Sequence, residues 1–228
     1  MSKTEAVFFD VDFTLIHPGR RFQADGYFDS CARHGIEVDA GLFDRAVAGA
    51  ARVLDDGDQL YDAELFVRYT ARIIELMGGR SSLVDKVARE LYAEWAEHHH
   101  FSLYDDVQDT LRTLAGRGLR LGLISNSHRC LVSFQSHFEL SGLLSVVISS
   151  AELGFMKPHP AIFQAALDGI GIPADRAVMV GDSLTHDVEG ALGAGMRGVL
   201  LARGGAASTP HGVPVISSLR ELPGILQG

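Results

Sequence analysis

The stretch AVFFDVDFTL, residues 6–15, ends an apolar run with two carboxylates, Asp10 and Asp12. Burying a carboxylate without a hydrogen-bonding or charged partner costs free energy, and the buried part of an apolar strand provides no such partner for either of them. Alternate residues of a strand point to the same side, so Asp10 and Asp12, with Thr14 at the next alternate position, can share one site at the strand's end. Two facing carboxylates can act as an ionised nucleophile or metal ligand and a protonated acid. The alternative is that one caps a turn while the other is solvated.

Further apolar runs rich in β-branched residues follow the first one along the chain. They cover residues 119–125, 144–150, 177–182, 197–202 and 213–217. Helix-like segments lie between them at residues 105–115, 159–167 and 185–194, and we expect Gly116 and Gly195 to end two of these helices in the left-handed conformation. Continuous apolar strands alternating with helices predict an α/β fold with a doubly wound, Rossmann-like parallel sheet. Such sheets bind ligands at the carboxyl ends of their strands.

Residues 20 to about 100 break this alternation. Four segments with apolar residues spaced by three and four predict helices, at residues 21–35, 39–54, 62–78 and 82–99. We therefore expect a Rossmann-like core made of residues 1–17 and 101–228, with a helical cap domain inserted at residues 18–100. Residues 98–106 are the expected exit linker, and two adjacent linkers would make a hinge for a lid that excludes water.

A second acidic pair, Asp182 and Asp187, follows the strand at residues 177–182. Gly181 permits a tight turn and a close backbone approach at the strand's end. Asp182 then takes the place on its strand that Asp10 takes on its own, and two such carboxylates suit Mg²⁺, which prefers oxygen ligands. For Asp187 the alternative is an acid in the first turn of a helix, stabilised by the helix dipole.

Two elements between the acidic pairs suit a phosphate group. Ser125 and Asn126 end the strand at residues 119–125, ahead of a helix whose first amides can also bind an anion. Lys157 precedes two prolines on a non-helical segment, and it is the only lysine after Lys86 in a chain that otherwise favours arginine. The alternative for Lys157 is a solvated surface charge.

Composition narrows the class of protein. The 228 residues are 46% hydrophobic and carry a formal net charge of −9, which argues against nucleic acid or an anionic membrane as the main partner. Neither a membrane-spanning apolar run nor a signal peptide is recognisable. Cys31 and Cys130 are expected to be free thiols. We expect a cytoplasmic protein, monomeric or homodimeric, without nucleic-acid or membrane partners.

The segments FFDVDFTL, LISNS, MKPHPAIF and VMVGDSLTHD resemble, in order, the four motifs of the haloacid dehalogenase-like (HAD) hydrolase superfamily. The helical insert after the first motif resembles the type 1 cap of subfamily I. The resemblance implies that Asp10 is a nucleophile that forms an aspartyl-phosphate, and that Asp12 protonates the leaving alkoxide and then activates water. Ser125, with Asn126 beside it, would bind the transferring phosphoryl group, and Lys157 would neutralise charge.

The same resemblance implies a Mg²⁺ cofactor. Asp10, Asp182 and the backbone carbonyl of Asp12 would hold the ion, with Asp187 in direct or water-mediated support. The chain departs from the family at Phe13, where glycine is usual, and we expect altered local packing there. In the family, the glycine at that position contributes its backbone conformation and its small size, and it takes no part in the chemical reaction.

The implied function is Mg²⁺-dependent hydrolysis of a small phosphomonoester metabolite, the phosphatase branch of the superfamily. The dehalogenases that the chain resembles generally lack an acid at the position of Asp12, because a halide leaves without a proton. The alternatives are a sugar-phosphate mutase, a phosphonatase, a 2-haloacid dehalogenase, or a non-catalytic HAD-fold binding protein. Thr14, Arg20 and His128 are weaker candidates for substrate or phosphate binding.

Overall fold

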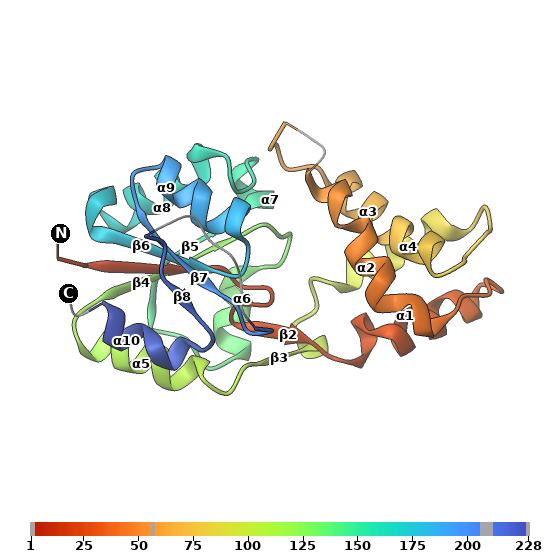
Figure 1. The fold of residues 1–228 in the computed structure, drawn as a ribbon, viewed down its shortest axis with the longest axis horizontal. Helices are drawn as coiled ribbons and strands as arrows, with labels where there is room; N and C mark the ends of the chain where they lie inside the picture. The colour runs from red at the N-terminus through yellow and green to blue at the C-terminus, as the bar shows by residue number, and fades with distance from the viewer. Residues whose placement is uncertain (1–2, 56–57, 206–211, 227–228) are drawn as a thin grey trace. The chain divides into compact units, whose positions relative to one another are not determined.

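The computed structural model describes residues 3–55, 58–205 and 212–226. The chain divides into two compact units, Met1–His17 together with Leu103–Gly228, and Pro18–Ser102. We call the first the sheet unit and the second the helical unit, and Figure 1 colours both along the chain.

The sheet unit contains a six-stranded parallel sheet in the order β5-β4-β1-β6-β7-β8, which confirms the predicted α/β, Rossmann-like fold. The strands are β1 (Ala6–Phe9), β4 (Arg120–Ser125), β5 (Leu144–Ser149), β6 (Ala177–Gly181), β7 (Arg197–Leu201) and β8 (Val215–Ile216). β1 lies between β4 and β6, with Ala6 opposite both Arg120 and Ala177. All four residues of β1 are buried, as its unbroken apolar sequence requires in a sheet covered on both faces.

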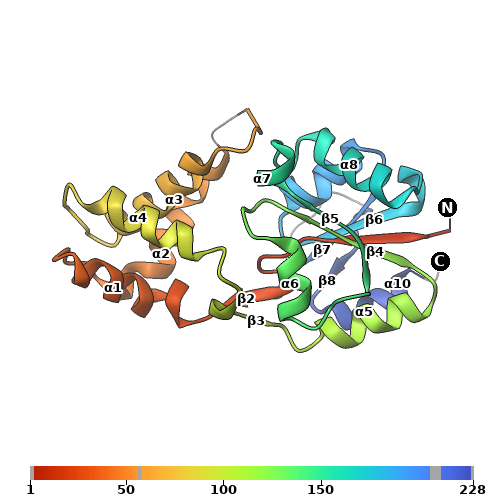
Figure 2. The same ribbon diagram turned by 180° about the vertical axis from the view of Figure 1, so that it is seen from behind.

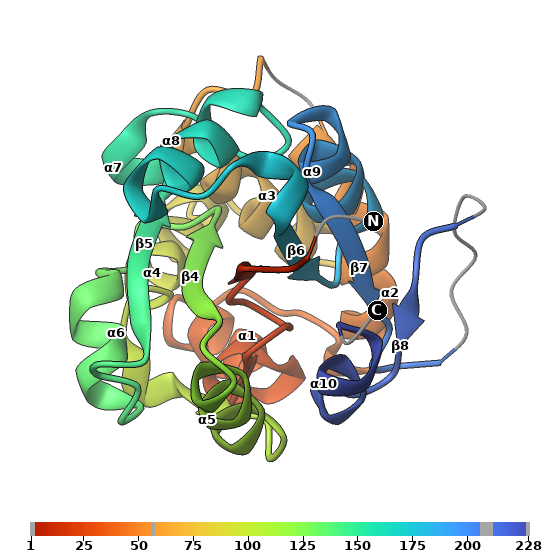
Figure 3. The same cartoon turned by 90° about the vertical axis from the view of Figure 1, so that its left-hand side faces the viewer.

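Helices cover the two faces of this sheet. They are α5 (Val107–Gly116), α6 (Leu131–His137), α7 (Ser150–Leu153), α8 (Pro160–Ile170), α9 (Gly190–Gly193) and α10 (Leu222–Ile225). α8 and α9 lie on one side of the sheet, and α5 and α10 lie on the other (Figure 1, Figure 3). One buried cluster joins Phe8 and Met179 of the sheet to Ile162 and Phe163 of α8.

The end of α5 differs from the expected one. Gly116 is the last helical residue rather than the left-handed cap, and Gly118 has the positive φ, 81°. The backbone N–H of Gly118 donates to the carbonyl of Ala115, and that of Leu119 donates to Leu114. This pair of bonds is a Schellman ending, whose left-handed residue is Gly118. Gly195 is left-handed as expected, with φ of 79°.

The segment expected to be one α-helix over residues 185–194 is split in two. A π-helix covers Leu184–Glu189, and α9 follows at Gly190–Gly193. The N–H of Val188 donates to the carbonyl of Ser183, five residues back, at 3.3 Å. The wider π-turn is frequent at functional sites, and here it carries Asp187.

The helical unit contains α1 (Ala24–Arg33), α2 (Phe43–Ala50), α3 (Ala63–Leu76) and α4 (Val84–Glu94), with α3 packed against both α2 and α4. Apolar residues at helical spacing, such as Leu65 and Ile73 in α3, form its buried face. The two connections to the sheet unit, β2 (Ile16–Pro18) and β3 (Phe101–Leu103), pair as a two-stranded sheet and lie side by side (Figure 1, Figure 2).

Both cysteines are free thiols, as expected: Cys31 is buried and Cys130 is exposed. Within the described residues, none of the helices combines the length and the apolar character needed to cross a lipid bilayer.

Candidate active site

The site lies in the sheet unit, where the central strands end. Asp10 follows β1, Asn126 follows β4 and Asp182 follows β6, and because these strands are parallel their carboxyl ends lie at one edge. The N–H of Asp10 donates to the carbonyl of Val180 at 2.9 Å, which continues the ladder past β1 and fixes the Asp10 backbone against β6.

Lys157 is the centre of this site. Its side-chain nitrogen Nζ donates to Oδ1 of Asp10 at 2.6 Å, to Oδ1 of Asp187 at 2.7 Å and to the carbonyl of Ile124 at 2.8 Å. The residue is 3% exposed, so it is a buried ion-pair partner and the surface alternative is wrong. Burial alone lowers the pKa of a lysine, but Asp10 and Asp187 outweigh it and raise the pKa of Lys157 above its usual range.

Asn126 holds Lys157 in place through its side-chain amide. Its Nδ2 donates to the carbonyl of Lys157 at 2.9 Å, and its Oδ1 accepts from the N–H of Lys157 at 2.7 Å. The sequence predicted a place for Asn126 beside the phosphate group. These two hydrogen bonds to the backbone of Lys157, 31 residues away, have no local signal in the sequence.

Asp187 turns back over the end of β6 and is 1% exposed. Its Oδ2 accepts from the N–H of Ser183 at 3.0 Å, and its Oδ1 accepts from Lys157. Glycine at position 181 makes this possible, because a Cβ there would lie 2.1 Å from Oδ2 of Asp187. Asp187 does lie in the first turn of a helix, as the alternative held, and it is in addition a buried partner of Lys157.

Three carboxylates form a group that fits a metal ion. One oxygen from each of Asp10, Asp182 and Asp187 lies within 4.8 Å of the others. Oxygen donors of this kind match the preference of Mg²⁺, and three carboxylates against one ammonium leave an excess of negative charge for a divalent cation.

Burial and neighbouring charge change the titration of Asp10 and Asp182. Burial raises the pKa of Asp10 well above the usual value of a carboxyl group; Lys157 opposes the rise and Asp187 adds to it. Asp182 as a whole is exposed, but protein atoms crowd its carboxyl group, and this loss of water together with Asp187 raises its pKa to about 6. A bound cation would favour the ionised forms of all three.

Ser125 offers an unused donor at the same edge. It is the last residue of β4, two positions past Leu123, which lies opposite Phe9 in β1. Its side chain is fully buried, and its hydroxyl has no hydrogen-bond partner among the residues that the structure describes. A buried hydroxyl without a partner is costly and suits a site that a polar ligand completes.

Asp12 occupies a separate position from the three-carboxylate group. Its Oδ1 accepts from Nη1 of Arg129 at 3.0 Å. Arg129 follows the LISNS segment by two residues and is one of the largest fully buried side chains of the chain. No local pattern in the sequence points to Arg129, because an arginine in a loop is ordinarily exposed.

The weaker candidates lie in different places. Thr14 is buried, and its hydroxyl donates to Oδ1 of Asp182 at 3.3 Å, while His128 is half-buried. Arg20 lies in the helical unit, where its exposed guanidinium pairs with Asp25 at 3.2 Å and Asp29 at 3.3 Å. Phe13 is 46% exposed and has a φ of 64°, the left-handed conformation that glycine adopts without strain.

A second ion pair supports the segment after β1. Both Nη atoms of Arg203 donate to Asp106, at 3.0 and 2.9 Å, and Nη2 also donates to the carbonyl of Thr14 at 2.8 Å. Asp106 is buried and accepts further bonds from the hydroxyl of Ser218 and the N–H of Leu219. This cluster ties the segment that carries Asp12 to the C-terminal part of the sheet unit.

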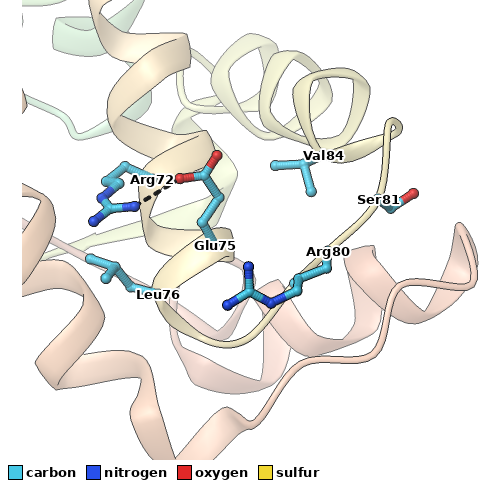
Figure 4. Close-up of a pocket in the computed structure, with 7 residues that line it drawn as sticks. Arg72, Glu75, Leu76, Arg80, Ser81 and Val84 are labelled. Atoms are coloured by element: carbon cyan, nitrogen blue, oxygen red, sulfur yellow. Dashed lines mark hydrogen bonds and ion pairs between the residues drawn. The ribbon is translucent and has the colours of Figure 1, made fainter.

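The helical unit has a surface pocket of its own, at the turn between α3 and α4 (Figure 4). It is lined by Arg72, Glu75, Leu76, Gly79, Arg80, Ser81 and Val84. Arg72 and Glu75, one turn apart on α3, pair at 3.0 Å (Figure 4). This pocket has one carboxylate, and it lacks the grouped acids and buried lysine of the sheet-unit site.

Known proteins resemble this chain over most of its length. A sequence model of one family, "Hydrolase: haloacid dehalogenase-like hydrolase", matches residues 4–195. Haloacid dehalogenase-like hydrolase domain-containing protein 3 of Danio rerio is 34% identical over 149 residues, 64% of this chain and 62% of that protein. The phosphoglycolate phosphatase of Rhodospirillum rubrum is 30% identical over 210 residues, 88% of this chain and 80% of that protein. Among solved structures, the 2-haloacid dehalogenase of Pseudomonas syringae has a TM-score of 0.65 and 26% identity, with 98% of each chain covered.

Proposed function

Because the chain belongs to the haloacid dehalogenase-like hydrolase family, we propose that it is a phosphatase that hydrolyses a small phosphomonoester through a phosphorylated Asp10 and depends on Mg²⁺. The observation that carries this proposal is that Asp10 and Asp12, two residues apart, are bound by different cations. Asp10 is bound to Lys157 within the three-carboxylate group, and Asp12 lies outside that group with a partner of its own. The phosphatase named among the relatives supports the same reaction class.

In the first half-reaction a carboxylate oxygen of Asp10 attacks phosphorus. The bond between phosphorus and the ester oxygen breaks, and the departing alkoxide takes a proton from Asp12. In the second half-reaction Asp12 removes a proton from water, whose oxygen attacks phosphorus while the bond to Asp10 breaks. Inorganic phosphate leaves and the Asp10 carboxylate is restored.

Other residues manage charge and position during these steps. Lys157 keeps Asp10 oriented and offsets negative charge, and the free hydroxyl of Ser125 donates to a phosphoryl oxygen. Asp10, Asp182 and Asp187 are the residues that would hold Mg²⁺. A bound Mg²⁺ supplies positive charge that favours the ionised carboxylates and the transferring phosphoryl group.

Asp12 separates this proposal from dehalogenation, although one structural neighbour is a 2-haloacid dehalogenase. An alkoxide is a poor leaving group that needs a proton, whereas a halide leaves without one. An acid placed two residues after the nucleophile therefore supports ester hydrolysis.

The helical unit, Pro18–Ser102, would serve as the cap domain in this proposal. Its two connections pair as strands β2 and β3, an arrangement that suits a hinge. We assign to this unit the selection of the organic part of the substrate.

The test is phosphate release from a defined panel of p-nitrophenyl phosphate, glycerol 3-phosphate, phosphoserine, phosphoglycolate and hexose 6-phosphates. Each ester is assayed with Mg²⁺ and with EDTA, with Asp10→Asn as the blank, and halide release from 2-chloropropionate is measured in parallel. We expect Mg²⁺-dependent release from at least one ester, absent in Asp10→Asn, and no halide. Recovery of the phosphoryl group on another carbon of a sugar would indicate a mutase, and activity retained in Asp10→Asn would overturn the proposal.

A further inference from the structure

The ion pair between Arg129 and Asp12 takes part in none of the bond changes of the proposed reaction. We propose that Arg129 is a positioning residue for proton transfer: it holds Oδ1 of Asp12, so that Oδ2 is the oxygen that gives up and takes back the proton. This inference rests on the proposed phosphatase function and deepens it.

Burial makes this contact a strong constraint. The Arg129 side chain is 0% exposed, and that of Asp12 is 18% exposed. If Asp12 turned away, the guanidinium would lose its carboxylate in a place that water does not reach, and breaking a buried pair in this way is strongly unfavourable. Asp12 therefore keeps Oδ1 on Arg129, and Oδ2 is the oxygen left for the proton transfer.

The backbone around Arg129 is fixed as well. Its N–H donates to the hydroxyl of Ser127 at 3.2 Å, and the carbonyl of Ser127 accepts from the N–H of Ala151 at 3.3 Å. The same short stretch of chain begins with Ser125, the last residue of β4, and Asn126, which follows it. Residues 125–129 thus supply the hydroxyl of Ser125, the hydrogen bonds of Asn126 to Lys157 and the ion pair of Arg129 with Asp12. Because these residues are adjacent in sequence, the backbone fixes their relative positions.

The anchor assigns the proton movements to one atom. As the ester oxygen leaves phosphorus, the Oδ2–H bond of Asp12 breaks and the proton passes to that oxygen. As water attacks, one of its O–H bonds breaks and the proton returns to Oδ2. Arg129 gives up no proton in either step and touches no reacting atom, so its contribution depends entirely on how much the reaction needs the proton from Asp12.

This dependence gives a readout that a merely structural role would not change. An alkyl ester needs the proton from Asp12, whereas p-nitrophenolate leaves readily without it. The value of kcat/KM reports the first half-reaction, and the ratio of two such values measured on one preparation cancels any fraction of unfolded protein. The readout is therefore kcat/KM for the fastest alkyl ester of the panel divided by that for p-nitrophenyl phosphate.

The experiment compares Arg129→Met and Arg129→Lys with Arg203→Met. The last is a matched control, because Arg203 also forms an ion pair with a buried aspartate, Asp106, and bonds to the backbone of the segment that carries Asp12, so it separates loss of support for that segment from loss of the bond to Oδ1 of Asp12. We expect Arg129→Met to lower the ratio by about 100-fold, within the range of general acid catalysis. Arg129→Lys should restore the ratio to within about tenfold of the wild type, and Arg203→Met should leave it unchanged.

Equal losses on both esters in Arg129→Met, or an equally selective loss in Arg203→Met, would overturn the role of Arg129. If Arg129→Met does not fold, the ratio in Arg129→Gln decides the same question. Failure of the underlying function would show differently, because the wild type would then release phosphate from no ester.

Discussion

Replacing Lys157 with methionine tests whether the buried ammonium holds the site together. Methionine has a similar length but no charge, so the change removes the three hydrogen bonds that Nζ makes and leaves Asp10 and Asp187 without their cation. Breaking a buried ion pair by removing one partner costs about 3–5 kcal/mol. We expect about 3 kcal/mol, the lower end, because Oδ2 of Asp187 keeps its bond from the N–H of Ser183. The midpoint of thermal unfolding should fall by about 6–12 °C.

Urea unfolding of the metal-free protein in EDTA at neutral pH, followed by far-ultraviolet circular dichroism, measures this loss. The single tryptophan, Trp95, lies in the helical unit, so its fluorescence reports that unit and shows whether both units unfold together. The matched control is Lys86→Met, because Lys86 is exposed on α4 and the same change there should alter the free energy of unfolding by less than about 0.5 kcal/mol. A loss of less than about 1 kcal/mol in Lys157→Met would refute the reasoning. Phosphatase activity should also fall by about 100-fold or more.

Three further predictions follow from contacts in the sheet unit. Asp12→Ala should lower the free energy of unfolding by about 3 kcal/mol because it removes the carboxylate of a buried ion pair with Arg129, whereas Asp12→Asn keeps an acceptor and should cost less; urea unfolding of both variants checks the order. Gly181→Ala should displace the Asp187 side chain, since its Cβ would lie 2.1 Å from Oδ2, and calorimetric titration with Mg²⁺ should show weaker binding. Burial alone would raise the pKa of Asp106, but bonds from Arg203, Ser218 and Leu219 outweigh it and lower the pKa below its usual value. Asp106→Asn should therefore be less stable than the wild type at pH 7, and the difference should shrink as the pH falls below about 4, where the stabilisation by the ionised carboxylate is lost. A difference that stays constant down to pH 3 would contradict this assignment.

The fold and the acids of the site could be predicted from the sequence because each has a local signal. Continuous apolar runs mark buried parallel strands, and a carboxylate directly after such a run falls at the sheet edge whatever the rest of the chain does. The order of strands then brings Asp10 and Asp182 together, since β1 and β6 are neighbours.

The contacts that hold these acids have no local signal. Asn126 and Lys157 are 31 residues apart, Asp12 and Arg129 are 117 apart, and Asp106 and Arg203 are 97 apart. Each pairing depends on how loops pack after the sheet forms. The π-helix that carries Asp187 was missed for a related reason, because its residues have an ordinary helical pattern and the wider turn shows only in the backbone bonds.

The central position of β1 sets the order in which a nascent chain can fold. β1 ends at Phe9, and the strands that pair with it begin at Arg120 and Ala177, more than 100 residues later in synthesis. At about 5–20 residues per second, the ribosome takes roughly 5–20 s to make even the first of them. The helical unit is continuous in sequence and is synthesised within that interval. The apolar strand AVFF has no sheet partner until β4 has been made. Residues 6–9, the segment that positions the nucleophile once the sheet closes, are therefore an apolar strand left unpaired throughout this interval.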